Sequence, residues 1–143
     1  MFEVHGWATI RLTPENRDRD DEEELHRRAM SQIESQVGYY VNDLGWAYNP
    51  LLEMRKVNGE ALIRVEGFSN HAGTLMEDLQ ALFHTIAEVA PGSYGLIYTM
   101  NDEEPAYDNE FRVYVLARGT LVERNDPFLS PFVPVVEDPY HDD

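Results

Sequence analysis

Residues 2–12 read FEVHGWATIRL, and their side chains alternate in character with a period of two. Apolar or small residues occupy the even positions, whereas Glu3, His5, Trp7, Thr9 and Arg11 occupy the odd ones. Because successive side chains of a strand point to opposite faces of its sheet, this pattern predicts a half-buried β-strand. The chain therefore begins with a strand that presents one apolar face to a core.

Two amphipathic helices are predicted from apolar residues spaced three and four apart. The first covers residues 25–44, and the acidic residues 18–24 lead into it. Carboxylates at a helix start interact favourably with the positive end of the helix dipole, so part of this acidic run has a structural explanation. The second helix covers about residues 75–89, with a capping box at residues 74–77 and a stop at Pro91-Gly92.

A β-hairpin is predicted around Asn58-Gly59, the pair that best tolerates the two positive φ values of a type I′ turn. Its strands cover about residues 51–57 and 60–68. Further strands are expected at about residues 94–100, 110–118 and 120–124, the last of them short.

These elements follow the order β-α-β-β-α-β-β, with or without a last strand. They predict an α+β fold, a mainly antiparallel sheet of five or six strands with two helices packed on one face. We expect a single domain over residues 1–143, because no repeat or linker divides the chain. A proline-rich, acidic tail from about residue 126 is expected to be extended and pinned by Phe128, Leu129 and Phe132.

The net charge of −16 is concentrated in three segments. Residues 15–24 and 101–110 carry −5 each, residues 137–143 carry −4, and the other 116 residues carry only −2. Such a chain repels nucleic acid phosphates and anionic membranes and attracts basic proteins, so we expect no nucleic acid or membrane partner. Solubility and a bias in the proteome of a GC-rich or salt-adapted host are alternative explanations of this charge.

Catalytic signatures are absent from the sequence. There is no cysteine, no nucleophile elbow and no phosphate-binding glycine loop, and the five histidines follow no metal-binding pattern. We therefore expect no enzyme, no cofactor and no metal. The amino-terminal residues resemble neither a signal peptide nor a membrane span, which makes the cytoplasm the expected location.

The loop at residues 102–110 contains five carboxylates, Asp102, Glu103, Glu104, Asp108 and Glu110. Oxygen ligands of this kind bind calcium, but the loop lacks the alternating ligands and central glycine of an EF-hand. Carboxylates at a loop tip are normally solvated, which disfavours acid–base catalysis. The composition of the loop favours an acidic surface that contacts a partner.

The face of the sheet opposite the helices is the second candidate surface. We expect it to show His5 and Trp7 beside residues of the strand at 110–118, namely Arg112, Tyr114, Leu116 and Arg118. Aromatic residues and arginines dominate the binding energy of protein interfaces, so this face resembles a binding patch. The alternative is that the tail folds back over this face and makes Trp7 part of a second small core.

Three stretches resemble the immunity protein 7 family of bacterial polymorphic toxin systems: FEVHGWATIR at residues 2–11, FRVYVLARG at 111–119 and FLSP at 128–131. The resemblance implies an α+β antidote that binds a cognate toxin domain and blocks its active site or a neighbouring surface. It supplies no catalytic residue.

The sequence thus predicts an immunity protein that neutralises a toxin domain, with a nuclease as one class of toxin that fits the acidity. The alternatives are a small carboxylate-based enzyme or calcium-binding module, and an acidic adaptor protein. The candidate partner-binding residues are Asp102, Glu103, Glu104, Asp108, Glu110, His5, Trp7 and Tyr114.

Overall fold

The computed structural model describes residues 1–15 and 22–141. Its elements in chain order are β1 (Phe2–Ile10), α1 (Glu22–Asn42), β2 (Leu51–Val57), β3 (Glu60–Ser69), α2 (Leu75–Val89), β4 (Tyr94–Asn101), β5 (Phe111–Ala117), β6 (Thr120–Asn125) and α3 (Phe132–Val135). No helix in the described part of the chain is long and apolar enough to cross a membrane.

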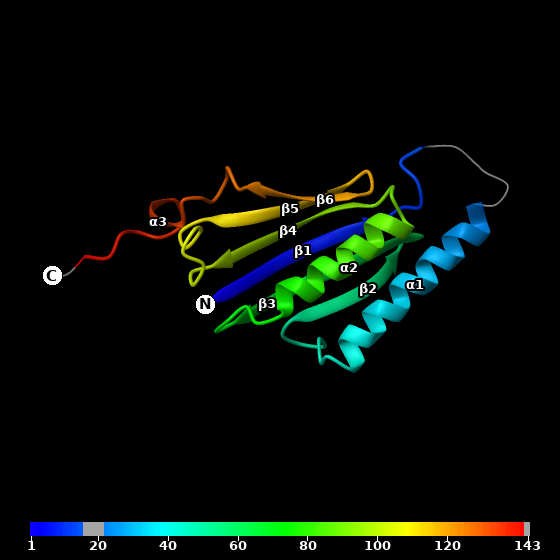
Figure 1. Ribbon diagram of the computed structural model, residues 1–143, viewed down its shortest axis with the longest axis horizontal. Coiled ribbons are helices and arrows are strands. Elements are labelled where there is room, and N and C mark those ends of the chain that lie inside the picture. The colour runs from blue at the N-terminus through cyan, green and yellow to red at the C-terminus, as the bar shows by residue number, and fades with distance from the viewer. Residues whose placement is uncertain (16–21, 142–143) are drawn as a thin grey trace.

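The six strands form one antiparallel sheet in the order β2-β3-β1-β4-β5-β6 (Figure 1). Strands β1 and β2 both run antiparallel to β3 between them, and β3 and β4 both run antiparallel to β1. Each helix therefore connects two parallel strands with one strand left between them, which is the ferredoxin-like split βαβ arrangement. Strands β5 and β6 extend this core, and the predicted α+β fold is confirmed.

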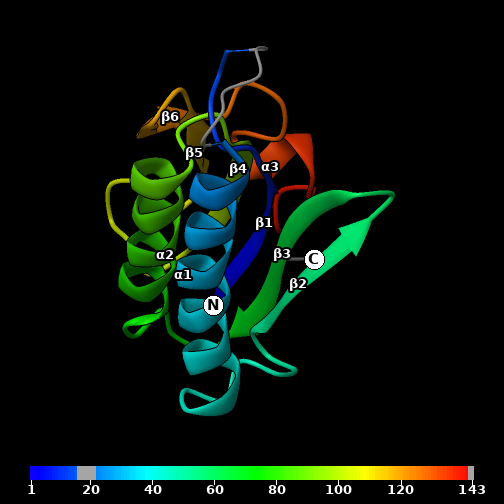
Figure 2. The same cartoon turned by 90° about the vertical axis from the view of Figure 1, so that its right-hand side faces the viewer.

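Helices α1 and α2 cover one face of the sheet (Figure 2). The even positions of β1, from Phe2 to Ile10, face them together with Val65 of β3 and Ile97 of β4. Fully buried Ile33 from α1 and a row of residues from α2 complete this core, the α2 row being Leu79, Leu82, Phe83 and Ile86. Burial of these apolar side chains is the main stabilising contribution to the fold.

The predicted hairpin turn is confirmed, whereas the predicted capping box of the second helix is not. Asn58 has φ 53° and Gly59 has φ 85°, which confirms the turn predicted between β2 and β3. Thr74 makes no side-chain capping bond, and its hydroxyl lies 3.3 Å from the Asp78 carboxylate instead. The capping box is therefore wrong, because Thr74 does not have the extended backbone that a capping side chain requires. Residues 16–21, which include most of the acidic run before α1, lie outside the described residues.

Strand β5 faces the opposite way from our prediction. Its alternation is confirmed, but Tyr114 pairs with Ile97, which pairs with Gly6 on the helix-covered side of β1. Arg112, Tyr114 and Leu116 therefore face the helices, and the expectation that they lie beside His5 and Trp7 is wrong. The other side of β5 carries Phe111 and Val113, which are also buried. Because β5 buries apolar side chains on both of its faces, the alternation of its residues does not indicate which face packs against the helices.

Asp126 anchors the carboxy-terminal tail at the end of β6. Its carboxylate is 5% exposed and accepts hydrogen bonds from the Tyr98 hydroxyl at 3.0 Å and from the Phe128 amide at 2.9 Å. The Leu129 amide at 2.8 Å and the Ser130 hydroxyl at 2.9 Å complete the set. Burial by itself raises the pKa of Asp126, but these four donors outweigh burial and hold the pKa below its usual value.

Beyond this anchor the tail folds back over part of the sheet, on the side away from α1 and α2 (Figure 2). Phe132 packs on Phe111 with ring centroids 5.9 Å apart, whereas Phe128 is 72% exposed. The expected pinning by Phe128 is therefore wrong. A single short helix, α3, interrupts the expected extended course. Trp7 remains 45% exposed, so the tail does not enclose it.

Replacing Asp126 with asparagine is expected to lower the free energy of unfolding by about 1–3 kcal/mol. The substitution replaces one acceptor oxygen with an NH₂ group, which then faces N–H donors instead of accepting from them. The low pKa of Asp126 means that ionisation of this carboxylate stabilises the folded state. That contribution is complete above the ordinary pKa of about 3.9 and is lost as the pH falls through the lower, folded pKa. Urea unfolding at pH 7 and at pH 3 will measure both effects.

The control is Asp138→Asn, because Asp138 is an exposed carboxylate of the same tail. The stability gap between wild type and Asp126→Asn should narrow at pH 3, whereas Asp138→Asn should match wild type at pH 7. An equal gap at both pH values would show that the ionised carboxylate is not what holds the tail.

Candidate functional site

Two of the three acidic segments lie at one end of the molecule. The loop between β4 and β5 and the tail after α3 are both at the end where the chain begins, whereas α1 starts at the opposite end (Figure 1). We call the loop residues 102–110 together with Glu137 and Asp138 the acidic end. The loop is ordered by backbone bonds from Glu104, Tyr107 and Glu110 to carbonyls within the segment 101–107.

Asn109 joins the loop to the tail. Its side-chain oxygen accepts a hydrogen bond from the Val133 amide at 2.9 Å, and its side-chain nitrogen donates to the Val133 carbonyl at 3.0 Å. The Phe132 amide bonds to the Asn109 carbonyl at 2.7 Å. These contacts hold two acidic segments side by side although their charges repel each other.

Some carboxylates of the acidic end are compensated within the chain. Asp102 lies 2.6 Å from the amino group of Met1, and this hydrogen bond raises the pKa of that amino group. Glu103 lies 2.7 Å from Nδ1 of His71, which belongs to the segment between β3 and α2. The Met1 amino group also lies 3.7 Å from Glu103, so it offsets part of the charge of these two carboxylates.

Glu104, Asp108 and Glu110 have no ion-pair partner among residues 1–15 and 22–141. All three are exposed. The same part of the chain contains no group of three or more acidic or histidine side chains that could hold a metal ion. The free charge of the loop is thus available to another molecule.

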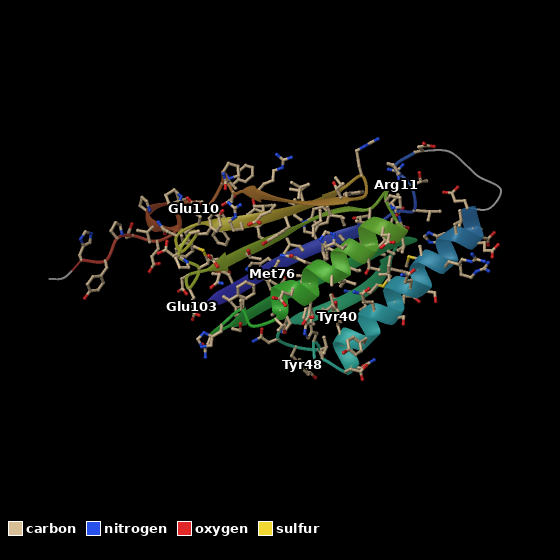
Figure 3. The ribbon with its side chains drawn as sticks, viewed as in Figure 1. Arg11, Tyr40, Tyr48, Met76, Glu103 and Glu110 are labelled. Atoms are coloured by element: carbon tan, nitrogen blue, oxygen red, sulfur yellow. The ribbon has the colours of Figure 1, made fainter. Side chains whose placement is uncertain are left out.

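A cleft of about 240 Å³ lies on the helix-covered side, next to the acidic loop. Figure 3 labels Met76 in the first turn of α2 and Glu110 at the end of the acidic loop. The cleft brings together two groups of predicted residues that the sequence placed apart, since Tyr114 lines it with Glu104 and Glu110. Its lining is Phe2, Ala72, Met76, Gln80, Thr99, Asn101, Glu104, Tyr107, Glu110, Arg112, Tyr114 and Glu123.

Arg112 is the cation within this cleft, and its partners belong to the chain. Its Nε donates to Glu123 at 2.9 Å, a second nitrogen donates to Asn125, and its guanidinium lies 4.0 Å from the centroid of the Tyr107 ring. Burial raises the pKa of Tyr114, and the nearby Glu123 raises it further. The phenol therefore stays neutral, as a wall of the cleft.

His5 and Trp7 lie on the opposite, uncovered face, beside a groove of about 640 Å³. We call this the aromatic groove, and its lining is Glu3, His5, Gly6, Trp7, Arg64, Glu66, Leu96, Tyr98, Phe111 and Leu129. The polar rim residues are bonded to one another, with the His5 ring 2.8 Å from the Glu3 carboxylate and Arg64 paired with Glu66 at 3.1 Å. Its apolar area is therefore exposed without unpaired charge around it.

Several neighbours of these surfaces were not predicted. The ring of Tyr94 meets Trp7 edge-on at 6.2 Å, and that of Phe68 meets His5 at 5.6 Å. Both follow from strand register, which requires knowledge of the pairing. The sequence analysis did not predict that Thr99 and Arg112 line a cleft. The sequence feature that could have indicated this is a polar side chain at a helix-facing position of an otherwise apolar strand.

The family model for immunity protein 7 matches residues 1–138 of the chain. No match was found among curated proteins or among solved structures. Membership implies an immunity protein of a toxin system, one that binds a cognate toxin protein and whose role is not enzymatic. The match spans nearly the whole chain, and this protein therefore belongs to the immunity protein 7 family.

Proposed function

We propose that this protein neutralises a cognate toxin domain by binding it one to one through the acidic end and occluding its active site or an adjoining basic surface. The observation that carries the proposal is the set of loop carboxylates without ion-pair partners in the described part of the chain, Glu104, Asp108 and Glu110. Exposed charges of one sign gathered at one end attract a partner of the opposite sign.

A basic toxin surface fits this charge. Enzymes that act on nucleic acids bind phosphates through lysine and arginine clefts, so an acidic surface competes with their substrate by carrying the same charge. Complementary charge also speeds association, to roughly 10⁸ M⁻¹s⁻¹ or more at low salt. A nuclease is therefore the class of toxin that we favour.

The aromatic groove supplies a second contact surface in this proposal. Trp7, Phe68 and Tyr94 are large, exposed and on one face. Buried aromatic anchors dominate interface energies, whereas exposed charges mainly set the rate of encounter. The acidic loop joins β4 and β5 at the end of the sheet, where the helix-covered face and the open face are both close. A partner that binds the loop can therefore also contact either face.

Co-expression tests the function itself. If the gene immediately upstream encodes a large secreted protein with a variable C-terminal domain, that domain is the toxin to test. Expression of that domain alone should stop growth, and co-expression of this protein should restore growth and yield a one-to-one complex on size-exclusion chromatography. A toxic domain that remains toxic and elutes separately would contradict the proposal.

Neutralising four loop carboxylates together, by Asp102→Asn, Glu103→Gln, Glu104→Gln and Asp108→Asn, is expected to slow association with the toxin domain. We expect a decrease of about tenfold or more at low salt and a weaker dependence of the rate on salt, measured by stopped-flow fluorescence.

The matched control removes four exposed carboxylates elsewhere, by glutamine at Glu23, Glu34, Glu60 and Glu88. It changes the net charge equally but leaves the acidic end intact. If both variants slow association equally, net charge rather than this surface determines the rate.

Trp7→Ala is expected to weaken the complex by at least about tenfold in Kd, mainly through faster dissociation, because it removes an aromatic anchor. Surface plasmon resonance measures both rates, and thermal unfolding checks that the central strand remains folded. Tyr48→Ala is the control, since Tyr48 is a highly exposed aromatic residue of the loop before β2 and does not line the groove. Wild-type binding by a folded Trp7→Ala variant would remove the open face from the interface.

A further inference from the structure

We propose that the cleft between α2, β5 and the acidic loop is a receptor for one basic side chain of the toxin, an arginine or a lysine, whose charged group lies between Glu104 and Glu110. This inference rests on the proposed function, because the basic side chain belongs to the toxin domain.

The side chains that line the cleft carry more negative than positive charge, which favours binding of a further cation. Glu104, Glu110 and Glu123 line it against a single guanidinium, that of Arg112, which leaves a formal charge of −2. Arg112 is already bound to Glu123 at 2.9 Å. The remaining two carboxylates, on the loop side, are the ones without an ion-pair partner among residues 1–15 and 22–141.

Thr99 adds to the lining of the cleft a hydrogen-bond acceptor that no other described residue occupies. This residue is only 5% exposed, lies on the helix-covered side of β4 and lines the cleft. Its hydroxyl makes no hydrogen bond with any residue that the structure describes. No enclosed side-chain oxygen or nitrogen of the described residues lacks a hydrogen-bond partner, so solvent reaches the Thr99 oxygen from the cleft. An ammonium or guanidinium N–H group can donate to this oxygen in place of water.

The shape and walls of the cleft fit a side chain rather than a free metabolite. Its volume of about 240 Å³ is below the roughly 300–1,000 Å³ typical of small-molecule pockets. Phe2, Ala72 and Met76 form an apolar wall, along which the aliphatic stem of a lysine or arginine can pack. Arg112 over Tyr107 shows that this environment accommodates a guanidinium.

The test compares two double variants with equal charge changes at the acidic end. The cleft variant is Glu104→Gln with Glu110→Gln, and the control is Asp108→Asn with Glu137→Gln, neither of which lines the cleft. The cleft variant is expected to raise the dissociation rate from the toxin domain by about tenfold or more, because it removes both carboxylates that pair with the bound cation. The control should change only association and its salt dependence. Equal dissociation rates for the two variants would overturn the inference while leaving the proposed function intact.

Thr99→Val keeps the shape of the side chain and removes its hydroxyl. It should also speed dissociation, by about threefold to tenfold, if that hydroxyl accepts a bond from the toxin. An unchanged rate in a variant with wild-type thermal stability would contradict the assignment of Thr99.

A titration without the toxin separates the two proposals. N-acetyl-arginine amide added to the ¹⁵N-labelled protein should shift the amide resonances of Thr99, Tyr107 and Tyr114, whereas the uncharged citrulline analogue should not. The Glu104→Gln, Glu110→Gln variant should lose these shifts. If the arginine amide produces no shifts there, the cleft is not a cation receptor, whatever the toxin domain does in the binding assays.

Discussion

Strand β1 is hydrogen-bonded along its length to β3 on one side and to β4 on the other, and this pairing determines which face every other strand presents. Side chains opposite each other in a ladder lie on the same face of the sheet. The chain of partners from Gly6 through Ile97 to Tyr114 therefore places Tyr114 under the helices. The chain from Trp7 through Leu96 to Val115 reaches the open face in the same way. A slip of one residue would exchange the two surfaces.

Strands β5 and β6 extend the ferredoxin-like core, and this extension positions the acidic loop and the carboxy-terminal tail. Strand β5 is covered by helices on one side and by the tail on the other, so that Phe111 and Leu116, which face opposite ways, are both buried. The tail reaches its position through the buried Asp126 carboxylate and through Asn109 in the acidic loop. The acidic loop and the acidic tail are thereby brought to one end of the molecule, where their mutual repulsion is balanced by directional hydrogen bonds.

The acidity of the chain thus has several different physical roles. Glu22, Glu23 and Glu24 occupy the first turn of α1, where the helix dipole favours negative charge. Asp126 is a buried anchor, and Glu123 neutralises Arg112. The Met1 amino group pairs with Asp102 and Glu103, which leaves Glu104, Asp108 and Glu110 as carboxylates without an ion pair in the described part of the loop. In the complex that we propose, these three carboxylates contact the basic surface of the toxin.

From the sequence alone the element order, the hairpin at Asn58-Gly59 and the α+β class could be predicted, because period-two and helical spacing are local properties of the chain. The exposure of the acidic loop could also be predicted, whereas the sequence did not decide between an open face with Trp7 exposed and a second small core covered by the tail. The facing of β5, the pairing of Glu103 with His71, and the cleft that joins Tyr114 to Glu104 and Glu110 could not be predicted. These features depend on which strands become neighbours and in what register, and contacts between residues distant in the chain leave no periodic trace in its sequence. Local pattern determined what the elements are, and only long-range pairing decided which side chains meet.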